Sequence, residues 1–208
     1  MTNITPRHVL LFWITGLSSL LMLAGGSTLY PLGRPILADR PPLEDVLLLA
    51  LLGAALGALL GAGQSFLLRQ GRGPSLVFVA YTSLGMAAGW VLWSVTSAAL
   101  VPFLRTRFDV LAPPVNYASA ALMGAALAIS QGSALNREGE DGRVWAVLTA
   151  LGWFLAWAVC AGISTVLLPD ASSPISSAVA GLVFGLIYSS TTAIAVYSRE
   201  RRQTYLAA

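Results

Sequence analysis

The sequence predicts an all-α integral membrane protein made of six transmembrane helices. The first observation is composition, because 56% of the residues are hydrophobic and only 10% are charged. A soluble domain carries about 25% charged residues, so this chain cannot cover a water-facing surface. The second observation is the spacing of the charges, which fall in short clusters separated by long uncharged runs. We therefore expect one membrane domain over residues 1–208 and no soluble domain.

Six uncharged runs lie between the charge clusters. They cover residues 8–33, 46–68, 73–104, 110–136, 144–169 and 171–198. A helix needs roughly 20 apolar residues to cross the hydrocarbon core, so each run is long enough for one crossing. The runs are continuously apolar and lack the alternation of barrel strands, which predicts helices. Arg7 and the apolar stretch ending at Ser27 have some features of a signal peptide, but we interpret this stretch as the first span.

Arginine placement predicts the orientation in the membrane. With a cytoplasmic N-terminus, the inner segments carry Arg7, Arg69, Arg72, Arg137, Arg143, Arg199, Arg201 and Arg202, whereas the outer segments carry Arg34, Arg40, Arg105 and Arg107. Cytoplasmic loops are enriched in arginine and lysine. We expect a multi-pass protein of the cell (inner) membrane with both termini in the cytoplasm.

The chain contains an internal duplication. Residues 53–102 align without a gap on residues 120–169, and the less common residue types match at Gln64 with Gln131, Thr82 with Thr149, Gly85 with Gly152, Trp90 with Trp157, and Pro102 with Pro169. Each copy is a helix hairpin, spans 2–3 and spans 4–5, in the same orientation. A parallel repeat predicts a pseudo-symmetry axis along the membrane normal. Span 6 is a possible start of a degenerate third copy, in which Gly181 and Gly185 match Ala120 and Gly124 and span 1 supplies the partner.

Small residues recur at every fourth position of the even-numbered spans. The helix-packing candidates among them are Gly53, Gly57, Gly61, Gly124, Gly181 and Gly185. Such grooves let helix backbones approach closely, either within the bundle, which we favour, or in an oligomer. The repeated pair Gln64 and Gln131 lies about one turn inside the cytoplasmic ends of spans 2 and 4. We expect these amides to bond each other or a nearby backbone, with snorkelling towards the headgroups as the alternative.

The residue types exclude several chemistries. No span interior contains a charged residue and the chain has no lysine, which argues against proton pumping, voltage sensing and a retinal Schiff base. One histidine (His8) and one cysteine (Cys160) cannot make a metal cluster, and we interpret both as structural. We therefore expect no catalytic residues, no metal site, no cofactor and no nucleic-acid partner.

Two function classes remain open. The first is a non-enzymatic accessory or scaffold subunit that packs against membrane lipids and other membrane protein subunits. The second is a small-solute binding or transport component, for which an apolar pocket with a few polar groups is needed. Its candidate residues are Tyr81, Thr82, Ser83, Asn116, Tyr117 and Trp153. The tryptophans near the predicted span ends, including Trp145, Trp90 and Trp157, are interpreted as interface anchors.

Overall fold

The computed structural model describes residues 42–68, 75–107, 112–166 and 174–206, and nearly all of them are helical. The five helices of this part are α2 (Pro42–Leu68), α3 (Leu76–Arg107), α4 (Ala112–Arg137), α5 (Arg143–Val166) and α6 (Pro174–Leu206). They lie on five of the six uncharged runs, and α6 continues beyond its run to Leu206. The first run, 8–33, lies outside the described residues.

Three of these helices are long and apolar enough to cross a membrane, over Val46–Phe66, Leu76–Thr96 and Arg143–Cys160. Residues Leu182–Ser198 of α6 form a shorter apolar stretch. The described part is therefore compatible with the membrane character predicted from composition. The predicted helical class is confirmed for it, since no strand occurs among the described residues.

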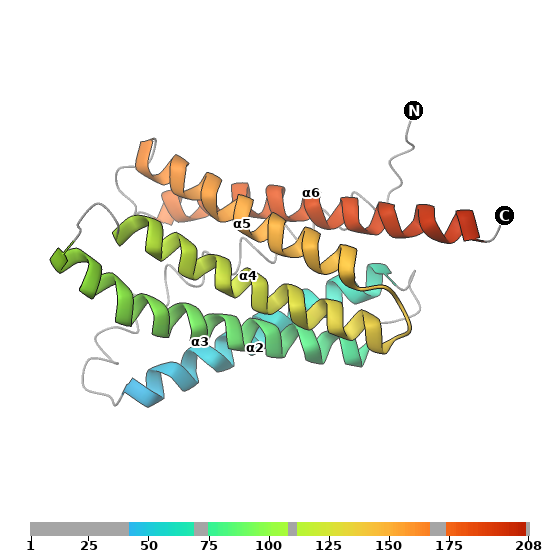
Figure 1. Ribbon diagram of the computed structural model, residues 1–208, viewed down its shortest axis with the longest axis horizontal. Coiled ribbons are helices and arrows are strands. Elements are labelled where there is room, and N and C mark those ends of the chain that lie inside the picture. Colours follow the sequence, from blue (N-terminus) through green and yellow to red (C-terminus); the bar gives the residue numbers. More distant parts are fainter. Residues whose placement is uncertain (1–41, 69–74, 108–111, 167–173, 207–208) are drawn as a thin grey trace.

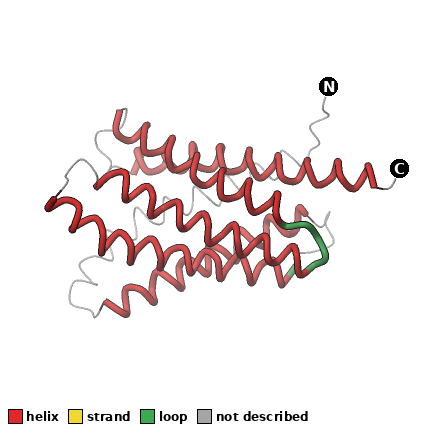
Figure 2. The backbone as a smooth tube through the Cα atoms, in the orientation of Figure 1, coloured by secondary structure: helices red, strands yellow, loops and turns green. Residues whose placement is uncertain are grey.

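The helices pack in chain order. Contacts join α2 to α3, α3 to α4, α4 to α5 and α5 to α6, so successive helices are neighbours. Figure 1 shows the helices running along the long axis of the molecule, with α4 between α3 and α5. The tube view in Figure 2 makes the short connection between α4 and α5 visible at one end. Short connections of this kind keep antiparallel helices adjacent.

Gly139 makes the turn between α4 and α5. It has a φ of 79°, a left-handed conformation that glycine adopts without steric cost. The Glu140 N–H then donates to the Leu135 carbonyl at 2.9 Å, which satisfies a carbonyl at the end of α4. The Gly142 N–H donates to Asn136 Oδ1 at 2.9 Å. This polar turn fixes where α5 begins relative to α4.

The core is shared by every described helix. One buried cluster combines Leu60 of α2, Met86 of α3, Leu127 of α4, Trp153 of α5 and Tyr188 of α6, with further members Met123, Ala156, Cys160 and Phe184. A second cluster contains Leu68, Phe78, Ala134, Leu135, Trp145, Ala195 and Val196. Large apolar side chains also cover the outside, as expected where the surrounding solvent is lipid.

Candidate functional site

A hydrogen bond joins the two repeated glutamines inside the bundle. Gln131 Nε2 donates to Gln64 Oε1 at 2.7 Å, and both side chains are completely buried, with 0% exposure. Gln64 comes from α2 and Gln131 from α4, so the bond links helices that are not neighbours in the chain. Neither amide reaches the surface of the bundle, as the snorkelling alternative would require. An unpartnered amide in an apolar interior is costly, which makes this mutual bond the favourable arrangement.

Both the oxygen and the nitrogen of the Gln131 amide make hydrogen bonds. Its Oε1 accepts from Trp145 Nε1 at 2.8 Å and from Thr149 Oγ1 at 3.4 Å, and its Nε2 also donates to Thr82 Oγ1 at 3.4 Å. An indole N–H is a donor only, so the group facing Trp145 is the amide oxygen. The amide nitrogen therefore faces Gln64, and the direction of each bond in the chain from Trp145 to Gln64 follows.

Two buried polar atoms where the series of hydrogen bonds from Trp145 through Gln131 reaches Gln64 have no hydrogen-bond partner. They are Gln64 Nε2 and the Tyr188 hydroxyl. The Tyr188 hydroxyl faces the side chains of Gln64, Thr149 and Thr192. Residues Gln64, Thr82, Gln131, Trp145, Thr149, Tyr188 and Thr192 are called the polar centre below. Every described helix contributes at least one residue to it.

Helical spacing brings these residues together. Trp145 and Thr149 are four residues apart on α5, and Tyr188 and Thr192 are four apart on α6, so each pair shares one face. Two threonine hydroxyls donate to backbone carbonyls of their own helices. Thr192 Oγ1 donates to the Tyr188 carbonyl at 2.9 Å, and Thr82 Oγ1 donates to the Phe78 carbonyl at 2.7 Å. Hydroxyls that bond their own helix cost little to bury.

Glycines let the helices come close enough for these bonds. A Cβ added to Gly57 would lie 2.7 Å from the Ser83 Cα and the Thr82 carbonyl oxygen, and Gly53 and Gly61 face α3 in the same way. A Cβ on Gly124 would lie 2.6 Å from the Trp153 ring. Gly185 is buried in α6. The surroundings of Gly181 lie outside the described residues. The contacts of Gly53, Gly57, Gly61 and Gly124 are all within the chain.

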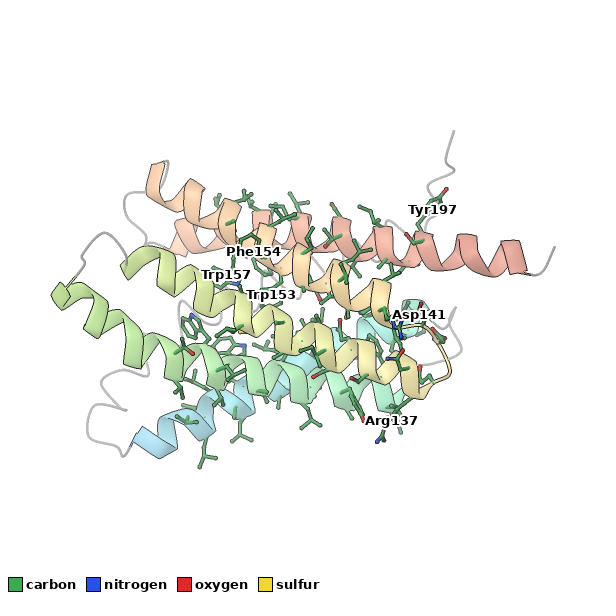
Figure 3. All side chains as sticks on the ribbon, in the orientation of Figure 1. Arg137, Asp141, Trp153, Phe154, Trp157 and Tyr197 are labelled. Carbon is green, nitrogen blue, oxygen red and sulfur yellow. The ribbon has the colours of Figure 1, made fainter. Side chains whose placement is uncertain are left out.

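An aromatic cluster lies next to the polar centre. Trp153 packs edge-on against Phe184 and Tyr188, with ring centroids 4.9 and 5.5 Å apart. Trp157 packs on Phe184 at 6.0 Å. Figure 3 labels Trp153 and Trp157 on α5, with Phe154 beside them. The buried indole nitrogens of Trp90, Trp153 and Trp157 have no hydrogen-bond partner.

Two serines and a glutamate connect α2, α3 and α4 at the end of the bundle that holds the turn between α4 and α5. Ser75 caps α3, since its Oγ accepts from the Phe78 N–H at 3.2 Å. Its own N–H donates to Ser65 Oγ of α2, and its hydroxyl donates to the Glu138 carboxylate after α4. Nearby, the Arg137 guanidinium lies over the Tyr81 ring at 5.4 Å. These contacts hold α2, α3 and α4 in one register.

The pocket candidates inferred from sequence do not form one site. Thr82 belongs to the polar centre, Tyr81 lies under Arg137, and Ser83 Oγ donates to the Ala54 carbonyl at 2.6 Å. Trp153 lies in the aromatic cluster. The side chains of Asn116 and Tyr117 lie outside the described residues.

The interpretation of Trp145 as an interface anchor is wrong. Its side chain is 3% exposed and its indole bonds Gln131. Sequence analysis also missed Tyr188 and Thr192, although their four-residue spacing on one helix was visible.

The polar centre consists of neutral hydrogen-bonding side chains, and none of its seven residues carries a carboxylate or an imidazole. Among the described residues, no group of three or more histidine, cysteine, aspartate or glutamate side chains could hold a metal ion.

No protein-family model, curated protein or solved structure matches the chain.

Proposed function

We propose that the protein is a non-enzymatic accessory or scaffold subunit of a larger complex in the cell membrane. In this proposal the chain crosses the membrane six times, with both termini in the cytoplasm. The duplicated hairpins, spans 2–3 and 4–5, correspond to α2–α3 and α4–α5. The matched contacts of Gly57 with Met86 and of Gly124 with Trp153 support the duplication, because each joins equivalent positions of the two copies.

One observation carries the proposal. The buried polar side chains of the described part are amides, hydroxyls and indoles, and the bonds among them link helix to helix. General acid–base and nucleophilic catalysis require a titratable or activated group at a common point. An interior of neutral groups that bond one another suits a structural element whose task is to keep its shape.

The outer surface supplies the faces for such a subunit. Exposed apolar side chains recur four or eight residues apart on one face of a helix. They include Leu47, Leu51 and Leu59 on α2, Val147, Leu151 and Leu155 on α5, and Leu182, Leu186 and Ile194 on α6. Lipid or an apolar protein surface can cover each stripe. Membrane helices associate through close packing of such surfaces.

The test is purification of the tagged chain from its native membrane, followed by native mass spectrometry. We expect a particle heavier than the 21.8 kDa chain, with a second membrane protein in fixed ratio. Leu151→Trp on α5 and Leu186→Trp on α6 enlarge two outer faces, and Leu84→Trp on α3 is the matched comparison. At least one substitution should remove the second protein without changing thermal stability. A monomer that carries only lipid would refute the subunit proposal.

The second candidate function is small-solute binding or transport. It is favoured by the unpartnered Gln64 Nε2, Tyr188 hydroxyl and Trp153 indole, which are buried close to Tyr188 or belong to it. A neutral solute with both donor and acceptor groups fits that chemistry. The same mass spectra test it, since a solute bound in the bundle would add a constant small mass that Tyr188→Phe removes.

A further inference from the structure

The buried polar atoms of the described helices that lack a partner are all hydrogen-bond donors. They are the amide nitrogen of Gln64, the hydroxyl of Tyr188 and the indole nitrogens of Trp90, Trp153 and Trp157. Of these groups, only the tyrosine hydroxyl can also accept a hydrogen bond. Buried polar groups in proteins are nearly always paired, so this surplus of donors indicates that the bundle binds an acceptor.

Small rotations of the side chains do not remove the surplus. The Tyr188 hydroxyl faces the hydroxyls of Thr149 and Thr192. These two hydroxyls already donate, to Gln131 and to a backbone carbonyl, so each has only acceptor capacity left. Tyr188 can therefore donate to one of them and accept one hydrogen from Gln64. Because a primary amide nitrogen carries two hydrogens, the second hydrogen of Gln64 stays unpaired, as do those of the indoles.

The donors border the aromatic cluster. The side chains of Gln64, Tyr188 and Trp153 are each 1% exposed or less, and Trp153 packs edge-on against Tyr188 and Phe184. An indole N–H that is directed at a ring finds only a weak acceptor there. Trp157 lies one turn beyond Trp153 on α5 and is half-buried (Figure 3). The cluster therefore extends from the polar centre to the apolar outer surface of the bundle.

The surplus of donors defines the chemistry of the bound group. A water molecule does not correct it, because water brings two hydrogens for the two that it accepts. A carbonyl oxygen accepts two hydrogens and brings none. An anion would also accept, but an uncompensated charge is costly in an apolar interior, and neither the polar centre nor the aromatic cluster contains a cationic side chain. The group that fits is a neutral carbonyl on an apolar body.

We propose that Gln64 and Trp153 bind a lipid-soluble carbonyl compound. Gln64 Nε2 donates to its carbonyl oxygen, the indole N–H of Trp153 donates to the same molecule, and its apolar body packs on the ring of Phe184. The inference rests on the second candidate function, small-solute binding, and it narrows the solute to one that only accepts hydrogen bonds. It is independent of the subunit proposal.

Two probes of similar shape separate the carbonyl group from its apolar body. They are cyclohexanone and methylenecyclohexane, which has a C=CH2 group in place of the C=O group. After thorough detergent exchange, cyclohexanone should raise the melting temperature of the purified protein by several degrees more than methylenecyclohexane, because a ligand stabilises the folded state that binds it. Equal shifts would overturn the carbonyl site. Small-solute binding as such is decided separately, by the constant bound mass in native mass spectra.

Substitutions test the position of the site. Gln64→Leu should abolish the difference between the two probes, and Trp153→Phe, which keeps a ring but removes the N–H, should reduce it. Trp93→Phe is the matched control, since Trp93 packs on Trp90 at 6.0 Å and lies outside the aromatic cluster. Ser190→Ala is a second control, because this exposed hydroxyl donates to a carbonyl of its own helix. Both controls should keep the full difference. A difference that persists in Gln64→Leu would overturn the proposal.

Two membrane constituents carry such a group, ester-linked lipids and quinones. Vesicles of a diacyl phosphatidylcholine and of its dialkyl ether analogue, which has no carbonyl, distinguish them. A higher melting temperature in the diacyl vesicles would identify the lipid ester as the ligand. A rise in the ether vesicles after addition of a decyl-substituted benzoquinone, without an effect of the lipid, would identify a quinone. Either effect should be absent in Gln64→Leu. A melting temperature that responds to neither, or that responds equally in Gln64→Leu, would overturn the proposal.

Discussion

A single side chain, Gln131, connects most of the polar centre. It makes two bonds through its oxygen and two through its nitrogen, to residues on α2, α3 and α5. An individual hydrogen bond within a bilayer contributes only about 0.6 kcal/mol on average. Loss of a shared partner costs more, because it leaves several buried groups unsatisfied at once.

Replacement of Gln131 should therefore destabilise the protein more than replacement of Gln64. Gln131→Leu removes the partner of Trp145 Nε1, Thr149 Oγ1 and Gln64 Oε1, whereas Gln64→Leu removes a partner of Gln131 alone. A buried group without a partner costs about 1–3 kcal/mol. We expect Gln131→Leu to lower the unfolding free energy by roughly 3 kcal/mol and Gln64→Leu by about 1 kcal/mol.

Denaturant titration in mixed micelles measures both losses, with Ser190→Ala as the neutral control. Equal losses for the two leucine variants would contradict the unequal roles of the glutamines.

The glutamines themselves were predictable from sequence, whereas the roles of Trp145, Tyr188 and Thr192 beside them were not. Two rare amides at matching positions of a duplication, one turn inside an apolar span, have few partners other than each other. Trp145 was misinterpreted because a tryptophan near a span end is usually an interface anchor. Its direction depends on which face of α5 meets α4, and that face is set by the contacts of Gly124 and Gly132. The rotation of a helix about its own axis depends on contacts with other helices, so it cannot be predicted from the residues of that helix alone.

At the scale of the helix, each element has one face of small residues and one of exposed large ones. On α2, Gly53, Gly57 and Gly61 meet α3, while Leu51 and Leu59 are directed outwards. The five described helices were predictable because a cluster of charged residues lies at each end of every uncharged run. The extension of α6 beyond residue 198 was not predictable. Charged residues end an apolar span, but they do not end a helix.

The two faces of α2 should respond oppositely to added volume. Gly57→Leu places a side chain where a Cβ already meets backbone atoms of α3, which cannot move aside. Overpacking costs about 1–3 kcal/mol or more, so we expect loss of the folded, extractable protein or a marked fall in its melting temperature. Ala55→Leu is the matched control on the exposed face and should leave both unchanged. Parental behaviour of Gly57→Leu would refute close packing of α2 on α3.

At the scale of the whole molecule, the proposed orientation puts the turn between α4 and α5 on the cytoplasmic side. Glu140 lies in that turn, and the segment 30–44 is expected on the opposite side. In the Cys160→Ser background, Glu140→Cys should react with a membrane-impermeant maleimide only from the cytoplasmic side. Asp39→Cys should react only from outside. The reverse pattern would invert the proposed topology.

The fixed bond direction in the polar centre has an electrical consequence. Conduction of a proton along a hydrogen-bonded chain requires every member to accept a proton on one side and release another on the opposite side. Trp145 can only donate, and it occupies the first position of the chain that passes through Gln131 to Gln64. Neutral amides are too weakly basic to take up a proton near pH 7. We therefore expect no proton conduction along this chain of bonds, and a vesicle whose membrane contains this protein should retain a pH gradient as long as one without it.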